Sequence, residues 1–336
     1  MTIDLGLGTS TSDHTGAAAR QRSVLLAYLP VALTAIVLAT IPLFVGDSRY
    51  FMSLAVNMLV FAAYAVAFNV IFGSTGQLFL CLGPLAGLSA YSSVILGNQY
   101  EAPLLVTIPL GVVLSASLGG LFSWIAVRRQ LDVIFIGIVT LAFSLVFYNL
   151  LLGGRGLTGG ETGMVVTAGS GTFLRDRIPS YYLFLALLVG FLALFRWLER
   201  SHYGWAFRAL KDDELAAELA GIDVARYKVA AGIIGSAMLG LTGALFAAHD
   251  GFISPTTFDF GDVDVRVLVI LAFGGIGSLL GPIVGAAAVT VVDELLRPLS
   301  QLRLTVYGVV LLVLFLGFRG GVVGTLTKLG QRIRSR

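Results

Sequence analysis

Charge, cysteine and histidine are all scarce in this 336-residue sequence. Only 12% of the residues are charged, whereas a soluble domain carries roughly a quarter, so there is too little polar surface to cover a water-soluble core. Cys81 is the single cysteine, which excludes an internal disulfide and a site built from several cysteines. His14, His202 and His249 are far apart, with no carboxylate pair or metal-ligand spacing beside them. Neither enzyme chemistry nor a metal site is indicated.

Apolar residues take the place of the missing charge. They make up 57% of the chain, and the runs Tyr50–Tyr100 and Val133–Gly154 contain no Asp, Glu, Lys or Arg. A membrane-crossing helix needs about 20 apolar residues. The sequence therefore predicts an all-α, polytopic transmembrane helical bundle. We expect eight full spans, near residues 24–45, 50–72, 79–98, 103–127, 132–153, 179–198, 226–248 and 304–318.

A further hydrophobic segment, 265–294, is interrupted by glycine and proline. Gly274, Gly275, Gly277, Gly281 and Pro282 fall in its middle. We expect two short helical pieces that meet at this break, which brings the total to about ten helical segments.

The basic residues set the expected orientation. With an even number of crossings, 15 of the 22 Lys and Arg residues fall on one side and seven on the other, and the richer side is the cytoplasm. Both termini are then cytoplasmic: a polar tail at 1–22, a transmembrane domain at 23–318 and a basic tail at 319–336. The net charge of +3 gives no basic stripe for nucleic acid.

The internal loop 199–228 is the longest cytoplasmic one. From Trp205 to Leu219 it has strong helix formers without Pro or Gly, so one continuous helix is expected, ending at Gly221. On such a helix Asp213, Ala217 and Gly221 would share one face almost free of bulk, open to a partner. An interfacial helix that only anchors the loop is the alternative.

Two glycine-rich stretches resemble each other. Gly73-Ser-Thr-Gly76-Gln77-Leu with Gly83-Pro84 is similar to Gly274-Gly-Ile-Gly277-Ser-Leu with Gly281-Pro282. Irregular backbone at membrane depth is found where it is buried in protein or lines a wet cavity. A substrate path and close helix packing remain the two interpretations.

Polar residues within the expected spans are the other path candidates, with interhelical hydrogen bonding as the alternative. They are Asn57, Asn69, Gln77 and Asn149. On the outer side, backbone N–H groups near Thr158, Gly159, Gly160 and Gly163 could face a ligand carboxylate or form an ordinary turn.

The outer loops differ in charge. One carries Arg155, Arg175 and Arg177, and the next carries the acids Asp250, Asp259, Asp262 and Asp264. These charges could dock a binding protein or simply be solvated.

The cytoplasmic loop 199–228 contains a spaced set of small, aliphatic and charged residues: Ser201, Gly204, Ala206, Glu214, Ala216, Ala217, Gly221, Ile222, Val224 and Lys228, with Arg208 keeping the basic character. With these residues it resembles the coupling motif of branched-chain amino acid ABC importer permeases, which are related to the ribose-type sugar permeases. Tyr203, Trp205 and Leu210 depart from that motif. Blocks at Gly76–Tyr91, Thr140–Phe143, Leu157–Gly163 and Gly274–Pro282 are also similar to that family.

The resemblance implies a LivM-type subunit of a multi-pass importer in the bacterial inner membrane. It implies a LivH-type second permease, two ATP-binding subunits and an extracytoplasmic substrate-binding protein. The glycine cluster Gly320–Gly330 lacks the Gly-Lys-Ser/Thr ending of a phosphate loop, so ATP would be used by the partners and no cofactor is expected here. The coupling residues carried over are Gly204, Arg208, Asp213, Glu214, Ala217, Gly221 and Ile222.

The substrate stays open at this point. Branched-chain or other small amino acids come first, with urea, short amides, aromatic acids and sugars as alternatives. Members of the family that carry branched-chain amino acids commonly have Ser, Gly and His where this chain has Phe79, Cys81 and Leu82. A stand-alone secondary transporter is the alternative from another class. Such a protein usually places a carboxylate or a cation-binding site at mid-membrane, whereas no Asp or Glu lies near the centre of an expected span here.

Overall fold

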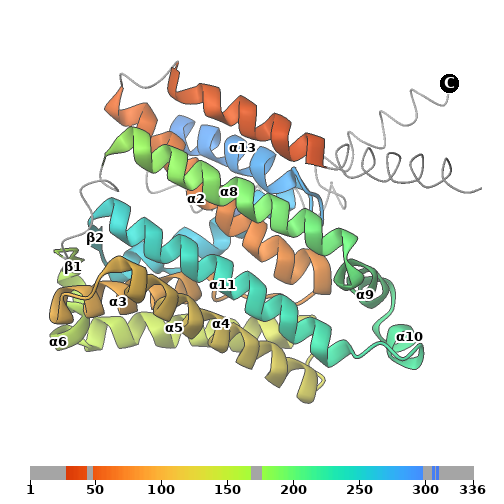
Figure 1. The fold of residues 1–336 in the computed structure, drawn as a ribbon. Coiled ribbons are helices and arrows are strands. Elements are labelled where there is room, and N and C mark those ends of the chain that lie inside the picture. Colours follow the sequence, from red (N-terminus) through yellow and green to blue (C-terminus); the bar gives the residue numbers. More distant parts are fainter. Residues whose placement is uncertain (1–27, 44–47, 168–175, 298–304, 307, 310–336) are drawn as a thin grey trace, which may run out of the picture.

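The computed structural model describes residues 28–43, 48–167, 176–297, 305–306 and 308–309, and their architecture is almost wholly helical (Figure 1). The elements are an apolar helix Tyr28–Leu43, α2 (Arg49–Phe68), a π-helical turn Asn69–Gly73, α3 (Leu82–Tyr100), α4 (Leu104–Arg128), α5 (Val133–Gly153), α6 (Arg155–Thr158), a 3-10 turn Gly160–Thr162, β1 (Met164–Val165), α8 (Arg177–Arg200), α9 (His202–Asp212), α10 (Glu214–Leu219), α11 (Val224–Asp250), β2 (Phe252–Ile253), a 3-10 turn Pro255–Phe258, a π-helical turn Phe260–Val265, α12 (Arg266–Gly274) and α13 (Gly281–Leu295).

Within the described residues, five helices are long and apolar enough to cross a membrane by length and composition. They are α2 with its π-helical extension, α4, α5, α8 and α11. The expected broken segment is confirmed as the pair α12 and α13. The expected span 304–318 and both tails lie largely or wholly outside the described residues, so the count of eight spans and the side of the termini stay predictions.

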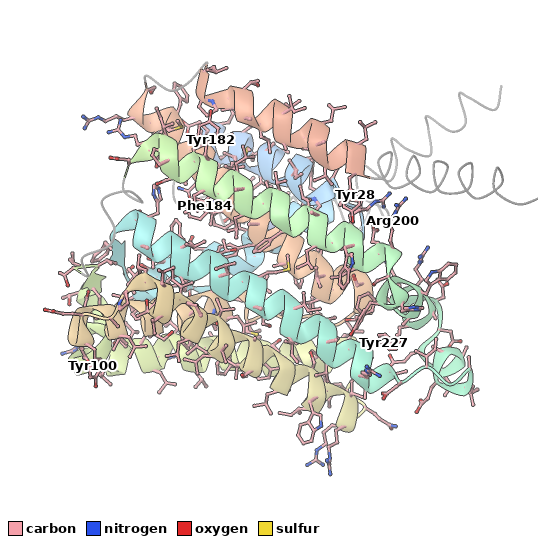
Figure 2. All side chains as sticks on the ribbon, viewed as in Figure 1. Tyr28, Tyr100, Tyr182, Phe184, Arg200 and Tyr227 are labelled. Atoms are coloured by element: carbon pink, nitrogen blue, oxygen red, sulfur yellow. The ribbon has the colours of Figure 1, made fainter. Side chains whose placement is uncertain are left out.

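The long helices lie side by side as a bundle, with α9 and α10 at one end and α6, β1 and β2 at the other (Figure 1). Arg200 and Tyr227 lie at the first end and Tyr100 at the second (Figure 2). The two short strands pair antiparallel, with Met164 opposite Ile253. Charged connectors and the small sheet therefore occupy opposite ends of an apolar body.

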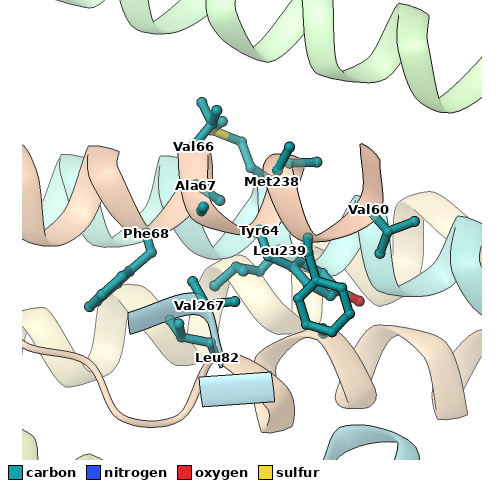
Figure 3. Packing of buried hydrophobic residues seen from close by; sticks show 14 of the residues in the cluster. Val60, Tyr64, Val66, Ala67, Phe68, Leu82, Met238, Leu239 and Val267 are labelled. Atoms are coloured by element: carbon teal, nitrogen blue, oxygen red, sulfur yellow. The ribbon is translucent and has the colours of Figure 1, made fainter. Parts of the chain in front are cut away.

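Helix α2 is the centre of the core. Of its most apolar stretch, 78% is buried, against 28% for α4 and α5. Phe68 packs in one cluster with Leu82 of α3, Leu239 of α11 and Val267 of α12 (Figure 3). The outer surfaces of α4 and α5 are apolar and exposed in the isolated chain, as expected of surfaces that meet lipid or another membrane subunit.

Small residues allow α4 and α11 to approach closely. A Cβ added at Gly119 of α4 would overlap the Ser236 side chain of α11, and one at Gly232 of α11 would overlap Ser123 of α4. The two Gly–Ser pairs are reciprocal, and they form a seam of small residues of the kind that drives helix association in membranes.

Candidate functional site

The connector between α8 and α11 consists of two helices, so the prediction of one continuous helix over 205–219 was wrong. Asp213 interrupts it with an extended backbone, φ −160° and ψ 112°, and its side chain accepts a hydrogen bond from the Ala216 N–H at 3.0 Å. Asp favours such an N-cap because its carboxylate satisfies an amide that the helix leaves unpaired. α9 begins in the same way, at Ser201, whose hydroxyl accepts from the Tyr203 N–H.

Because the helix is interrupted at Asp213, the prediction that Asp213, Ala217 and Gly221 share one open face was also wrong. Ala217 is 4% exposed and faces the protein, while Gly221 lies beyond α10 at φ +85°. Gly221 does end the helix as predicted, because its N–H bonds to the Glu218 carbonyl and the Ile222 N–H to the Ala217 carbonyl, the Schellman arrangement. Ile222 then packs on the small apolar cluster beneath the connector.

The connector instead exposes large apolar side chains. Trp205 is 71% exposed, Leu215 67% and Leu219 82%. The sequence marked Trp205 only as a departure from the family motif, and it did not mark Leu215 or Leu219 as exposed. The i, i+4 spacing of Leu215 and Leu219 in a polar loop was a usable signal, but which face of α10 is buried could be read only from the fold.

Gly204 and Arg208 fix α9 against the end of α8. A Cβ at Gly204 would overlap the backbone of Glu199, so the two segments meet backbone to backbone. The Arg208 guanidinium donates to the carbonyl oxygens of Gly204 (3.1 Å) and Glu199 (3.3 Å), and it stacks over the Trp205 ring. Both residues thus set the angle of the connector.

Glu214 holds α10 to α11. Both of its carboxylate oxygens accept from the Lys228 ammonium at 2.6 Å. The Lys228 side chain is 11% exposed and that of Glu214 51%, so one partner is inside and the other at the surface.

The two glycine-rich stretches, residues 73–76 and 274–281, interrupt their helices and meet in space, and we call them the two glycine breaks. The Asn69 side chain accepts from the Gly277 N–H at 2.7 Å and donates to the Ser278 carbonyl at 3.0 Å. A Cβ at Gly73 would lie 3.1 Å from the Gly277 nitrogen. The end of α2 and the turn between α12 and α13 therefore form one junction, which rests on Asn69.

The backbone after the first break is irregular and partly buried. Gly76 adopts φ +72°, and residues 76–81 form no helix. Gln77 is fully buried, and its Nε2 donates to the Thr75 hydroxyl (2.9 Å) and to the Lys228 carbonyl (3.0 Å). In the second break, Gly274 packs so closely on Gly281 that a Cβ would overlap it.

The remaining polar candidates are less central. Asn57 is half-buried on α2. Asn149, a path or interhelical candidate from the sequence, lies on the exposed side of α5 and donates to the Leu145 carbonyl of the same helix at 2.8 Å. A helical carbonyl can accept a second hydrogen bond from a side chain one turn later, so the Asn149 amide is satisfied within its own helix.

The glycines at the opposite end form a tight turn before β1. Gly159, Gly160 and Gly163 all have positive φ, at 73°, 58° and 69°. The Thr158 hydroxyl donates to the Leu151 carbonyl at 2.6 Å, and the Gly163 N–H bonds to the Gly160 carbonyl. Of the two interpretations left open by the sequence, this geometry favours the turn.

One acid expected on the outer surface is inside the protein. Asp264 is 1% exposed and accepts from the backbone N–H groups of Leu82 (2.5 Å) and Gly83 (3.1 Å). It caps the first turn of α3, because unpaired amides at the start of a buried helix need an acceptor. The expected acidic patch is thus smaller: Asp250 and Asp262 are exposed.

The basic patch is only partly described. Arg155 and Arg177 are exposed, and Arg175 lies outside the described residues. Arg266, at the start of α12, is mostly buried in an ion pair with Asp293 at 2.5 Å. This pair joins the start of α12 to the end of α13.

Two pockets flank the connector. One, of about 330 Å³, lies between α8, α9 and both glycine breaks, and it is lined by Gly73, Arg196, Glu199, Arg208, Lys211 and Gly277 among others. The second, of about 560 Å³, separates α10 from the turn between α4 and α5, and its charged lining residues are Asp132, Glu214, Glu218, Asp223 and Lys228.

Comparison with known proteins gives a consistent result. The family model described as branched-chain amino acid transport system / permease component matches residues 50–318. The chain is 30% identical over 320 residues to the high-affinity branched-chain amino acid transport system permease protein LivM of Salmonella typhimurium, covering 87% of this chain and 72% of that protein. LivM of Escherichia coli is 31% identical over 288 residues, covering 78% and 67%.

A less similar relative is a permease protein of an import system for a different solute. The autoinducer 2 import system permease protein LsrC of Salmonella typhi is 26% identical over 277 residues, covering 79% of this chain and 77% of that protein. No solved structure matches the chain.

Proposed function

We propose, because this chain belongs to the family of permease components of branched-chain amino acid transport systems, that it forms part of the membrane path of an ATP-driven importer. Its solute is a branched-chain or other small amino acid, by similarity to the two LivM proteins. A LivH-type permease completes the path, two ATP-binding subunits drive it and an extracytoplasmic protein delivers the solute. The bacterial inner membrane is the location that the family implies.

The exposed surface of the connector carries this proposal. Leu215 and Leu219 project from a short helix whose opposite side is anchored by Ala217 and by the Glu214–Lys228 pair. A rigid, partly apolar ridge beside a pocket suits a protein partner better than water. We assign it to the ATP-binding subunits.

Reconstitution tests the function directly. Proteoliposomes that contain this chain, its second permease and the ATP-binding subunits should accumulate radiolabelled leucine, isoleucine or valine when supplied with the binding protein, and only with ATP on the connector side. Uphill uptake by this chain alone, driven by an ion gradient, would instead identify the secondary transporter.

The docking surface is tested by Leu219→Glu. We expect at least about a tenfold loss of ATP-binding subunit in co-purification, because burying a leucine contributes about 1.5–3 kcal/mol. Arg226→Ser is the control, since Arg226 is exposed just beyond the connector helices. Equal recovery of the ATP-binding subunit with Leu219→Glu and with the unaltered chain would move the docking surface elsewhere.

A further inference from the structure

Lys211, at the end of α9, reaches out of the connector into the junction of the two glycine breaks. Its ammonium donates to the Gly73 carbonyl at 3.2 Å, and a Cβ at Gly277 would lie 3.0 Å from the same nitrogen. Gly73 ends the helical extension of α2, where unpaired carbonyls and the helix dipole favour a cation. One side chain of the connector thus touches both breaks.

The contact extends beyond Gly73 through Asn69. Its amide bonds to the backbone of Gly277 and Ser278, so displacement of the end of α2 must also displace the turn between α12 and α13. Lys211 is therefore positioned to act on two segments that lie more than 200 residues apart in the chain.

A second link runs from the other connector helix to the same stretch. Glu214 of α10 binds Lys228 of α11, and the Lys228 carbonyl accepts from the buried Gln77 amide. Gly73 and Gln77 enclose Gly76, which is at positive φ with open space around its Cβ position. Between the two attachment points, Gly76 and Gln77 lie outside the helix, so the backbone at these two residues can change conformation without breaking a regular helix.

We propose that Lys211 and the Glu214–Lys228–Gln77 link are the positioning residues through which movement of the connector changes the conformation of residues 73–77. This inference rests on the proposed function. It names the side chains that would carry the motion from the ATP-binding subunits to the non-helical residues 76–81. The other end of this stretch is fixed, because the Leu80 N–H bonds to the Thr140 hydroxyl of α5 and the Leu82 N–H to Asp264.

The test is Lys211→Met in the complete reconstituted importer, which removes the ammonium and keeps the length. Two rates are measured together: ATP hydrolysis stimulated by the loaded binding protein, and uptake of radiolabelled leucine. We expect docking of the ATP-binding subunit to stay unchanged and hydrolysis to stay within about twofold, while solute moved per ATP falls on the order of tenfold, as for loss of one charge-assisted hydrogen bond. Glu214→Gln should give a smaller fall, because the amide still reaches Lys228.

Chemical rescue separates a positioned charge from general damage. In Lys211→Cys, alkylation with 2-bromoethylamine rebuilds an ammonium of lysine length and should restore the ratio, whereas iodoacetamide should not. Cys81 is fully buried and protected from both reagents. Arg226→Met is the matched control, since it removes one exposed cation near the connector and should leave the ratio unchanged.

The failures can be told apart. A complete importer with unaltered subunits that shows no ATP-dependent uptake overturns the proposed function. If that importer works, the positioning role is overturned either by a normal ratio in Lys211→Met, or by parallel loss of docking, hydrolysis and uptake, or by equal rescue with the two reagents.

Discussion

Asp264 shows how a single side chain can be given opposite roles by sequence and by structure. It stands in an acidic stretch that reads as outer surface, yet its carboxylate is buried against the first amides of α3. Those amides lie about 180 residues earlier in the chain, and no local pattern joins the two places. The capping role could therefore not be predicted from the sequence.

Removing that carboxylate should weaken the fold. Asp264→Ala leaves two buried N–H groups without an acceptor, at a cost of about 1–3 kcal/mol for each buried donor. We expect a lower midpoint of thermal unfolding in detergent, with Asp264→Asn intermediate because its amide oxygen still accepts one bond. An unchanged midpoint in both variants would mean that these amides find other acceptors.

Ala217 also differs from its expected role as part of an open face. Because it faces inward, a bulky substitution there would unpack the connector rather than block a partner. Leu219 and Leu215 on the opposite face are the informative positions for docking.

Among the helices, the seam between α4 and α11 depends on two glycines. Gly119→Leu should push α4 and α11 apart, since even a Cβ at this position overlaps Ser236. Overpacking of this kind lowers the free energy of unfolding by about 1–3 kcal/mol. Thermal unfolding and the yield of monodisperse protein measure the effect. Gly190→Leu on α8 is the control, because a Cβ there meets nothing within 4 Å. An equal loss of stability in both variants would show that close packing of α4 on α11 is not the cause.

Element positions followed well from the sequence, because the length of an uncharged apolar run is a physical requirement for crossing lipid. The expected 103–127 and 132–153 became Leu104–Arg128 and Val133–Gly153. The connector was less predictable. An N-cap at Asp213 stabilises the start of α10 by only about 1 kcal/mol. Whether the chain forms one continuous helix or two helices divided at Asp213 therefore depends on packing, which a sequence pattern does not contain.

The expected orientation in the membrane can be tested with single cysteine variants. In intact cells, Arg226→Cys, exposed at the connector end, should react with a membrane-impermeant maleimide only after the membrane is permeabilised, because basic residues gather at this end and place it in the cytoplasm. The native Cys81 is buried and silent. Val165→Cys, exposed in the small sheet at the opposite end, should label from outside without opening. Exchange of the two results would reverse the molecule in the membrane.

The amide of Gly277 has a further use in hydrogen-exchange experiments. Its proton is held by the Asn69 side chain, 208 positions earlier, so it should exchange with deuterium slowly while that contact lasts and quickly once it opens. A peptide that contains Gly277 would then report, in mass spectrometry, on the state of the α2 terminus. Fluctuations of two distant parts of the chain could be followed as one exchange rate.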